Sequence, residues 1–114
     1  MSEIQGIGRI KLHEGKLEEF NRLGARIMEV VRTQDTGTLQ FEIFFNDDQT
    51  ECIVLERYKD YAAFMEHGAH LGNFTAAIAT MGSVTAACLS ESSEELRAVL
   101  AGSGVELFTP HLSL

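Results

Sequence analysis

The chain has 114 residues, of which 45% are hydrophobic and 23% charged, and this balance excludes intrinsic disorder and predicts one domain over residues 1–114. Its formal net charge of −8 excludes a long basic groove, so we expect no nucleic-acid partner. Because no long apolar run occurs and no basic segment precedes an apolar one, we expect no membrane partner and a cytoplasmic location.

The first part of the chain predicts a strand, a helix and a second strand. Residues 4–12 alternate loosely between apolar and other side chains, and apolar residues at helical spacing run from Leu17 to Val31. The turn residues 36–38 end that helix. Strict alternation then predicts a strand that turns four side chains toward one face, namely Leu39, Phe41, Ile43 and Phe45.

A second strand, at residues 52–58, follows a polar turn, so the two strands predict an antiparallel hairpin. Asp60 is suited to cap a helix that starts at Tyr61. Gly72 is predicted to interrupt this helix, and a second helical piece is predicted to end with Gly82 just past its last turn.

The last part of the chain predicts a further strand, a short helix and a final strand. The strand covers residues 84–89. Ser92 and Glu95 have the spacing of a capping box, which predicts a helix that ends near Gly102. Residues 105–108 then form a short apolar run before a proline, as expected for a fifth strand.

This order of elements predicts an α+β fold of the ferredoxin-like β-α-β-β-α-β type. Its core spans about residues 4–90, and residues 91–114 add a C-terminal helix and strand. Both long helices would cover one face of the sheet. Because Phe44, Ile53 and Leu55 are predicted on the other face, we expect two copies to pair sheet to sheet as a homodimer.

Two segments resemble the antibiotic biosynthesis monooxygenase family of dimeric α/β-barrel proteins, which includes cofactor-free quinol monooxygenases. One is the strand Ile53–Tyr58 with the following Phe64, Glu66 and His67, and the other is the opening Gly8–Phe20. The resemblance covers about residues 4–90. It implies a dimeric α/β barrel, a small quinol-like or polyphenolic aromatic substrate, and reaction with O2 without a cofactor.

His67 and His70 are the candidate catalytic residues, because a spacing of three places both on one helix face. One of them could be the general base that takes a proton from a phenol, since imidazole titrates near neutral pH. A metal site is a second interpretation, although no third ligand stands nearby in sequence. The third interpretation is that both are ordinary helix residues with satisfied hydrogen bonds.

Three aromatic residues and one amide are candidate substrate-binding residues: Tyr58, Phe64, Phe74 and Asn73. Tyr58 and Phe74 flank the predicted histidine helix, and an apolar slot with a few polar groups is the usual form of a ligand site. The alternative is that the aromatic side chains are core residues and that Asn73 caps a helix. For Glu56, on the same strand as Tyr58, an ion pair with Arg9 or Arg57 is expected.

No glycine-rich nucleotide motif and no nucleophile elbow occurs, so we expect no cofactor and no metal. A monooxygenase is the first functional hypothesis. A non-enzymatic dimeric barrel that binds a small apolar ligand or a partner protein is the second. An isomerase or lyase, which would also use a histidine or tyrosine in proton transfer, is the third.

Overall fold

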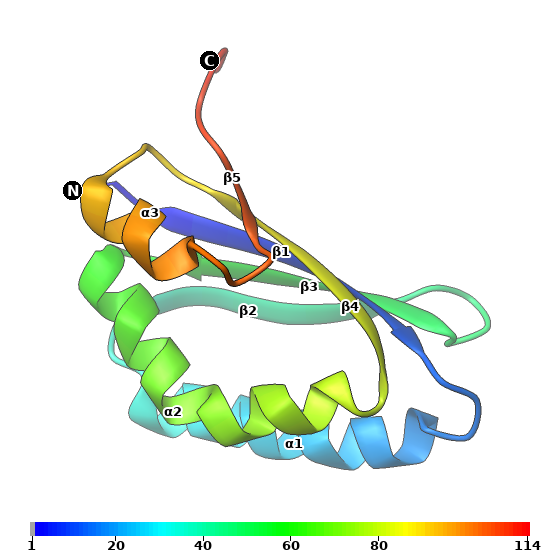
Figure 1. The fold of residues 1–114 in the computed structure, drawn as a ribbon. Coiled ribbons are helices and arrows are strands. Elements are labelled where there is room, and N and C mark those ends of the chain that lie inside the picture. The colour runs from blue at the N-terminus through cyan, green and yellow to red at the C-terminus, as the bar shows by residue number, and fades with distance from the viewer. Residues whose placement is uncertain (1) are drawn as a thin grey trace.

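A five-stranded sheet lies over two long helices in the computed structural model, which describes residues 2–114 (Figure 1). The strands are β1 (Ile4–Leu12), β2 (Thr38–Phe45), β3 (Glu51–Tyr58), β4 (Gly82–Leu89) and β5 (Glu106–Phe108). The helices are α1 (Leu17–Gln34), α2 (Tyr61–Ala79) and α3 (Glu94–Leu100). The strand order β2-β3-β1-β4-β5, antiparallel except for the β4–β5 pair, confirms the predicted ferredoxin-like fold with its added helix and strand.

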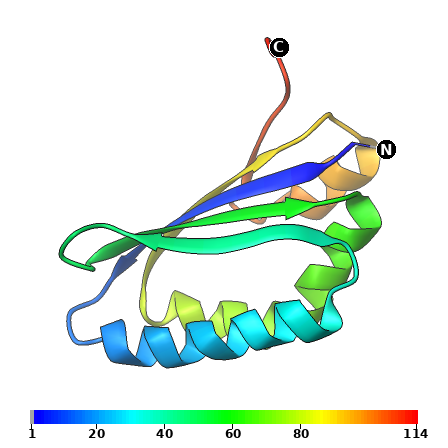
Figure 2. The same cartoon turned by 180° about the vertical axis from the view of Figure 1, so that it is seen from behind.

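The two faces of the sheet have different surroundings, as the view from behind also shows (Figure 2). Alternation along β1 places Ile4 and Ile10 toward the helices, where both are buried. Ile7 points to the other face, and 39% of its surface is exposed. The helices α1 and α2 therefore cover one face, called the inner face here, and leave the outer face open.

Two groups of buried side chains fill the space between the inner face and the helices. The larger group joins the sheet to α1 and the second half of α2, and it consists of Ile10, Phe20, Leu23, Ile27, Cys52, Val54, Leu71 and Met81. The smaller group contains Ile4, Tyr58, Ala63, Cys88 and Leu96. Leu96 lies on α3 and is 1% exposed, so the C-terminal extension closes the end of the core at which Tyr58 is buried.

The predicted break at Gly72 is wrong, because α2 runs without interruption from Tyr61 to Ala79. Leu71 is buried and Phe74 packs against the core, so tertiary packing holds the helix on both sides of the glycine. Thr80, rather than Gly82, caps the end of α2. Gly82 begins β4 instead, where a Cβ atom would lie 2.2 Å from the carbonyl oxygen of Lys11. No helix within residues 2–114 has the length and apolar character needed to cross a membrane.

Two further local predictions differ from the structure. Leu39 is more exposed than predicted, at 49%, because the pairing of β2 with β3 shifts between Thr38 and Gln40. At α3 the capping residue is Ser93, not Ser92. Its backbone is extended, and its side chain accepts a hydrogen bond from the backbone N–H of Leu96.

We expect glycine-to-alanine substitutions to have opposite effects at two positions. Gly82→Ala forces β1 and β4 apart and should lower the free energy of unfolding by about 1–3 kcal/mol. Gly72→Ala is the matched control, because nothing lies within 4 Å of the added methyl group and the helix should gain up to about 1 kcal/mol. Urea denaturation measures both, and equal effects at the two positions would contradict the prediction.

Candidate active site

Asp35 is the first residue after α1, and its carboxylate turns into the protein. Its backbone N–H donates to the carbonyl of Val31, which ends the helix. Only 1% of its side chain is exposed. The hydroxyl of Thr38, at the start of β2, donates to Asp35 Oδ2 at 2.7 Å, so one acceptor site of the buried carboxylate is already satisfied by the neighbouring strand.

The loop between α1 and β2 is held tightly against α2. A Cβ atom on Gly37 would lie 2.5 Å from Ala63 Cβ, so only glycine permits this approach. The backbone N–H of Lys59 donates to the carbonyl of Gly37 at 2.9 Å. The Glu66 carboxylate accepts from both the backbone N–H and the hydroxyl of Thr36. These contacts fix the position from which the neighbouring Asp35 reaches α2.

Both histidines of α2 bind the same carboxylate. His67 Nδ1 lies 2.8 Å from Asp35 Oδ2, and His70 Nδ1 lies 2.6 Å from Oδ1. The His67 side chain is 9% exposed and that of His70 is 26% exposed. Burial alone raises the pKa of Asp35, but the hydrogen bonds from Thr38, His70 and His67 outweigh it and lower the pKa below its ordinary value.

On the sheet side, Glu56 and Tyr58 of β3 face the histidines. His67 Nε2 lies 3.4 Å from Glu56 Oε1, and the Tyr58 hydroxyl donates to the same Glu56 oxygen. Tyr58 is 1% exposed. Its burial, and then the nearby Glu56 carboxylate, raise the pKa of Tyr58 well above the ordinary value, so its phenol keeps its proton at neutral pH.

Aromatic rings surround the buried histidine. The ring centroids of Phe41 and Tyr58 lie 5.3 and 4.9 Å from that of His67. Phe64, one turn from His67 on α2, packs against Tyr58 with centroids 5.7 Å apart. The imidazole of His67 is therefore fixed by apolar packing as well as by its carboxylate partners.

A hollow of about 370 Å³ lies beside this cluster, between the last turns of α1 and the start of β2. Asp35, Thr38 and Phe41 line its inner end. Apolar side chains of Met28, Val31 and Leu39 form much of the rest, together with polar residues of α1 and β2. Its size and mixed lining are those of a site for a small ring-shaped ligand.

The candidate residues lie at different distances from the cluster. His67, His70 and Tyr58 belong to it, and Phe64 packs against Tyr58. Phe74 lies one turn beyond His70 and packs against the larger core, with the Arg26 guanidinium 5.4 Å from its ring centre. Asn73 is an exposed residue in the interior of α2, so it is not a helix cap.

Sequence reasoning missed Asp35 and misread Glu56. The expected ion pair of Glu56 with Arg9 or Arg57 is wrong, because Arg9 pairs with Glu51 and Arg57 with Glu3 on the outer face. Alternation along β3 places Glu56 on the same face as Tyr58. This pattern indicated that Glu56 lies on the inner face, away from the two arginines. For Asp35, no local pattern indicates a partner on another helix.

Within residues 2–114, no group of three or more histidine, cysteine, aspartate or glutamate side chains is arranged to hold a metal ion. The Nδ1 atoms of His67 and His70 both point to Asp35 rather than toward a shared empty position. Cys52 and Cys88 are buried and unpaired, on β3 and β4, with β1 between these strands.

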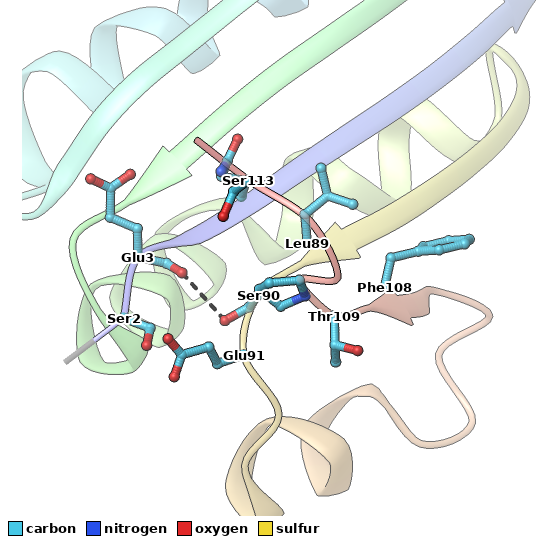
Figure 3. A pocket seen from close by; sticks show the side chains of 10 residues that line it. Ser2, Glu3, Leu89, Ser90, Glu91, Phe108, Thr109 and Ser113 are labelled. Atoms are coloured by element: carbon cyan, nitrogen blue, oxygen red, sulfur yellow. Dashed lines mark hydrogen bonds between the residues drawn. The ribbon is translucent and has the colours of Figure 1, made fainter.

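A larger hollow lies elsewhere, where the N-terminal residues, the end of β4 and the C-terminal tail meet (Figure 3). It measures about 780 Å³. Its labelled side chains are mostly small or acidic, and the hydroxyl of Ser90 donates to the backbone carbonyl of Glu3 across its floor. None of its lining residues belongs to the Asp35 cluster, so the smaller hollow is the candidate ligand site.

Comparisons with known proteins agree on the type of fold. The family model described as antibiotic biosynthesis monooxygenase matches residues 6–80. The structure of MupZ from Pseudomonas fluorescens aligns with a TM-score of 0.86 at 19% identity, over 98% of this chain and 88% of that chain. Comparison with curated proteins gives no significant match.

Two other solved structures are similar over the main part of the chain. Rv0793 from Mycobacterium tuberculosis aligns with a TM-score of 0.70 at 20% identity, over 81% of this chain and 97% of that chain. A mutant of SnoaB, described as a cofactor-independent oxygenase from Streptomyces nogalater, aligns with a TM-score of 0.66 at 17% identity, over 81% and 93%. At these identities the likenesses establish the fold.

We expect Asp35→Asn to destabilise the protein at pH 7 by about 1–3 kcal/mol, because a neutral amide cannot accept from both histidines and Thr38. The pKa of Asp35 is lowered in the folded state, so its stabilisation is present above the ordinary carboxyl value and lost as pH falls through the lowered one. Urea denaturation should show the difference from wild type shrinking as the pH falls below the ordinary carboxyl range.

Asp47→Asn, at the exposed tip of the β2–β3 hairpin, is the matched control and should change stability little. A difference between wild type and Asp35→Asn that stays constant from neutral to acidic pH would show that the charge of Asp35 does not stabilise the fold.

Proposed function

Because the chain belongs to the antibiotic biosynthesis monooxygenase family, we propose that it is a cofactor-independent monooxygenase that oxidises a quinol-like or polyphenolic aromatic with O2. One observation carries the proposal. Two histidines, His67 and His70, are held by a single buried carboxylate, Asp35, which also lines a hollow of mixed polar and apolar character. An imidazole oriented by a carboxylate is a general base suited to neutral pH.

The proposed reaction starts when a histidine takes the proton of a substrate hydroxyl and leaves an electron-rich phenolate. A hydroquinone that becomes a hydroxyquinone gives up four electrons, two from its hydroxyl groups and two from one ring C–H bond. O2 accepts all four, so one oxygen atom enters the ring and the other leaves as water. The balance requires no other oxidant or reductant, and the similarity to an oxygenase described as cofactor-independent supports this chemistry.

In this proposal the substrate ring enters the hollow between α1 and β2, where Asp35, rather than either histidine, forms the wall next to the cluster. Met28, Val31 and Leu39 supply apolar contacts, and Phe41 links the hollow to His67. A volume of about 370 Å³ is sufficient for a substrate of one or two rings.

Oxygen uptake with a panel of hydroquinones tests the activity. We expect the variant with both His67→Ala and His70→Ala to lose at least about a hundredfold in rate, because the base is absent. His13→Ala is the matched control, since His13 is an exposed histidine between β1 and α1 and should be dispensable. Full activity in the double variant would rule out the histidine mechanism.

A monooxygenase also differs from a simple quinol oxidase in its product. One atom of labelled O2 should appear in the aromatic product, and catalase should leave the measured uptake unchanged. If catalase halves the uptake, the protein makes hydrogen peroxide and is not a monooxygenase.

We further propose that two chains form a homodimer through the outer sheet face. Large apolar side chains remain partly exposed there, namely Ile7, Phe44, Ile53, Leu55 and Phe108. They cover β1, β2, β3 and β5, so the patch crosses almost the whole sheet. Apolar side chains spread over a sheet face in this way are typical of an interface between copies of a chain.

We expect Ile53→Glu to convert the dimer into a monomer, because it places a charge at the centre of this face. Sedimentation velocity measures the change. Ala76→Glu, on the exposed side of α2, is the control and should leave the dimer intact. A wild-type protein that sediments as a monomer at every accessible concentration would overturn the proposed pairing.

A non-enzymatic ligand-binding protein is the second candidate. The rings of Phe41 and Tyr58 pack against His67, and the phenol of Tyr58 is tied to Glu56, so this part of the site is already filled by the protein's own side chains. This reading predicts that aromatic ligands bind with no oxygen uptake and no chemical change, which equilibrium dialysis followed by mass analysis would detect.

A further inference from the structure

Each ring nitrogen of His67 faces a carboxylate oxygen. Nδ1 lies 2.8 Å from Asp35 Oδ2, in the loop before β2, and Nε2 lies 3.4 Å from Glu56 Oε1, on β3. The remaining packed neighbours are the uncharged ring of Phe41 on β2 and the phenol of Tyr58 on β3. On its own helix the nearest titratable group of the cluster is His70, which also binds Asp35.

The hydrogen-bond roles of these groups determine where the protons lie. The Tyr58 hydroxyl donates to Glu56, so Glu56 acts there as an acceptor. An ionised carboxylate can only accept, and a neutral imidazole carries one N–H. A neutral His67 has one ring nitrogen without a proton. The lone pair of that nitrogen would therefore face an oxygen of Asp35 or Glu56, which is unfavourable. An imidazolium donates its Nδ1 proton to Asp35 and places its positive Nε2–H group 3.4 Å from the Glu56 oxygen, at ion-pair distance.

We infer that His67 is a fixed imidazolium bridging Asp35 and Glu56, and that His70 is the one histidine of the pair able to accept a proton from a substrate. The assignment of His70 as base deepens the proposed function and rests on it. The proton positions do not depend on that function, because they follow from the contacts within the protein.

His70 has the arrangement that a base requires. Asp35 holds its Nδ1, which selects the tautomer that leaves Nε2 as an acceptor. Among residues 2–114, no group hydrogen-bonds His70 Nε2, and about a quarter of the side chain is exposed. With Asp35 and Glu56 ionised and His67 cationic, the cluster carries one net negative charge. A proton taken up by His70 neutralises that charge, which favours the transfer.

His67 is a positioning residue in this scheme. It touches no substrate, and it holds Asp35 in place between the two imidazole rings while offsetting part of its charge. Its loss should disturb the protonation of His70 rather than remove the base itself.

Nitrogen-15 NMR of the imidazole groups in the full-length protein tests the inference without any substrate. Nitrogen shifts distinguish a bare ring nitrogen from one that carries a proton, and the His67→Gln and His70→Gln variants assign the signals. At pH 7 we expect both ring nitrogens of His67 to carry protons, while neutral His70 carries its proton on Nδ1. His13 and His111, both exposed, serve as internal references.

Glu56→Gln is the informative variant. Its amide keeps the size of the side chain but removes the charge that faces His67 Nε2, so at pH 7 part of the His67 population should lose its Nε2 proton while His70 keeps its tautomer. A role of Glu56 in packing alone would leave both ring protons of His67 in place.

The inference is overturned if His67 carries only one ring proton at neutral pH, or if neutral His70 carries its proton on Nε2. If hydroquinone oxidation is observed, His70→Gln should lower kcat by about a hundredfold or more, and a variant that keeps the wild-type rate also overturns the assignment. Absence of oxygen uptake in the wild type rejects the proposed function instead, and the NMR result still decides the proton positions.

Discussion

The buried carboxylate of Asp35 is the contact on which the candidate site depends. It connects the end of α1, the start of β2 and the middle of α2 through hydrogen bonds to Thr38, His67 and His70. A carboxylate at the C-terminal end of a helix also meets the negative end of the helix dipole, which is unfavourable. An unpaired buried charge costs several kcal/mol, so the loop is stable in this position only because the donors on α2 and β2 surround it.

The main elements of the fold are predictable because their patterns are local. Alternation identified β2 and β3 and placed Phe41 and Tyr58 on the inner face, and helical spacing identified α1. The failures have tertiary causes. The helix continues through Gly72 because packing of the neighbouring residues outweighs the poor helix propensity of glycine. Leu39 is more exposed than predicted because of a register shift that alternation cannot reveal.

The site was predictable only in part. The spacing of His67 and His70 shows that they share a helix face, and both reach the same acceptor. That acceptor stands 32 residues before His67, with two strands between them. Its identity therefore depends on the close contact of Gly37 with Ala63, which brings the loop onto α2. Alternation placed Glu56 correctly on the inner face, but the arginines that were expected to pair with it, Arg9 and Arg57, lie on the outer face.

The two glycines of α2 have a consequence for access to the site. Gly68 and Gly72 flank His70, both are exposed, and neither has any neighbouring atom that would prevent a side chain. Each glycine in a helix interior reduces local stability by about 1 kcal/mol relative to alanine. This turn of α2 should therefore open, and exchange its amide hydrogens, more readily than α1. Such brief local opening exposes the imidazole of His70 further while the sheet and α1 remain folded.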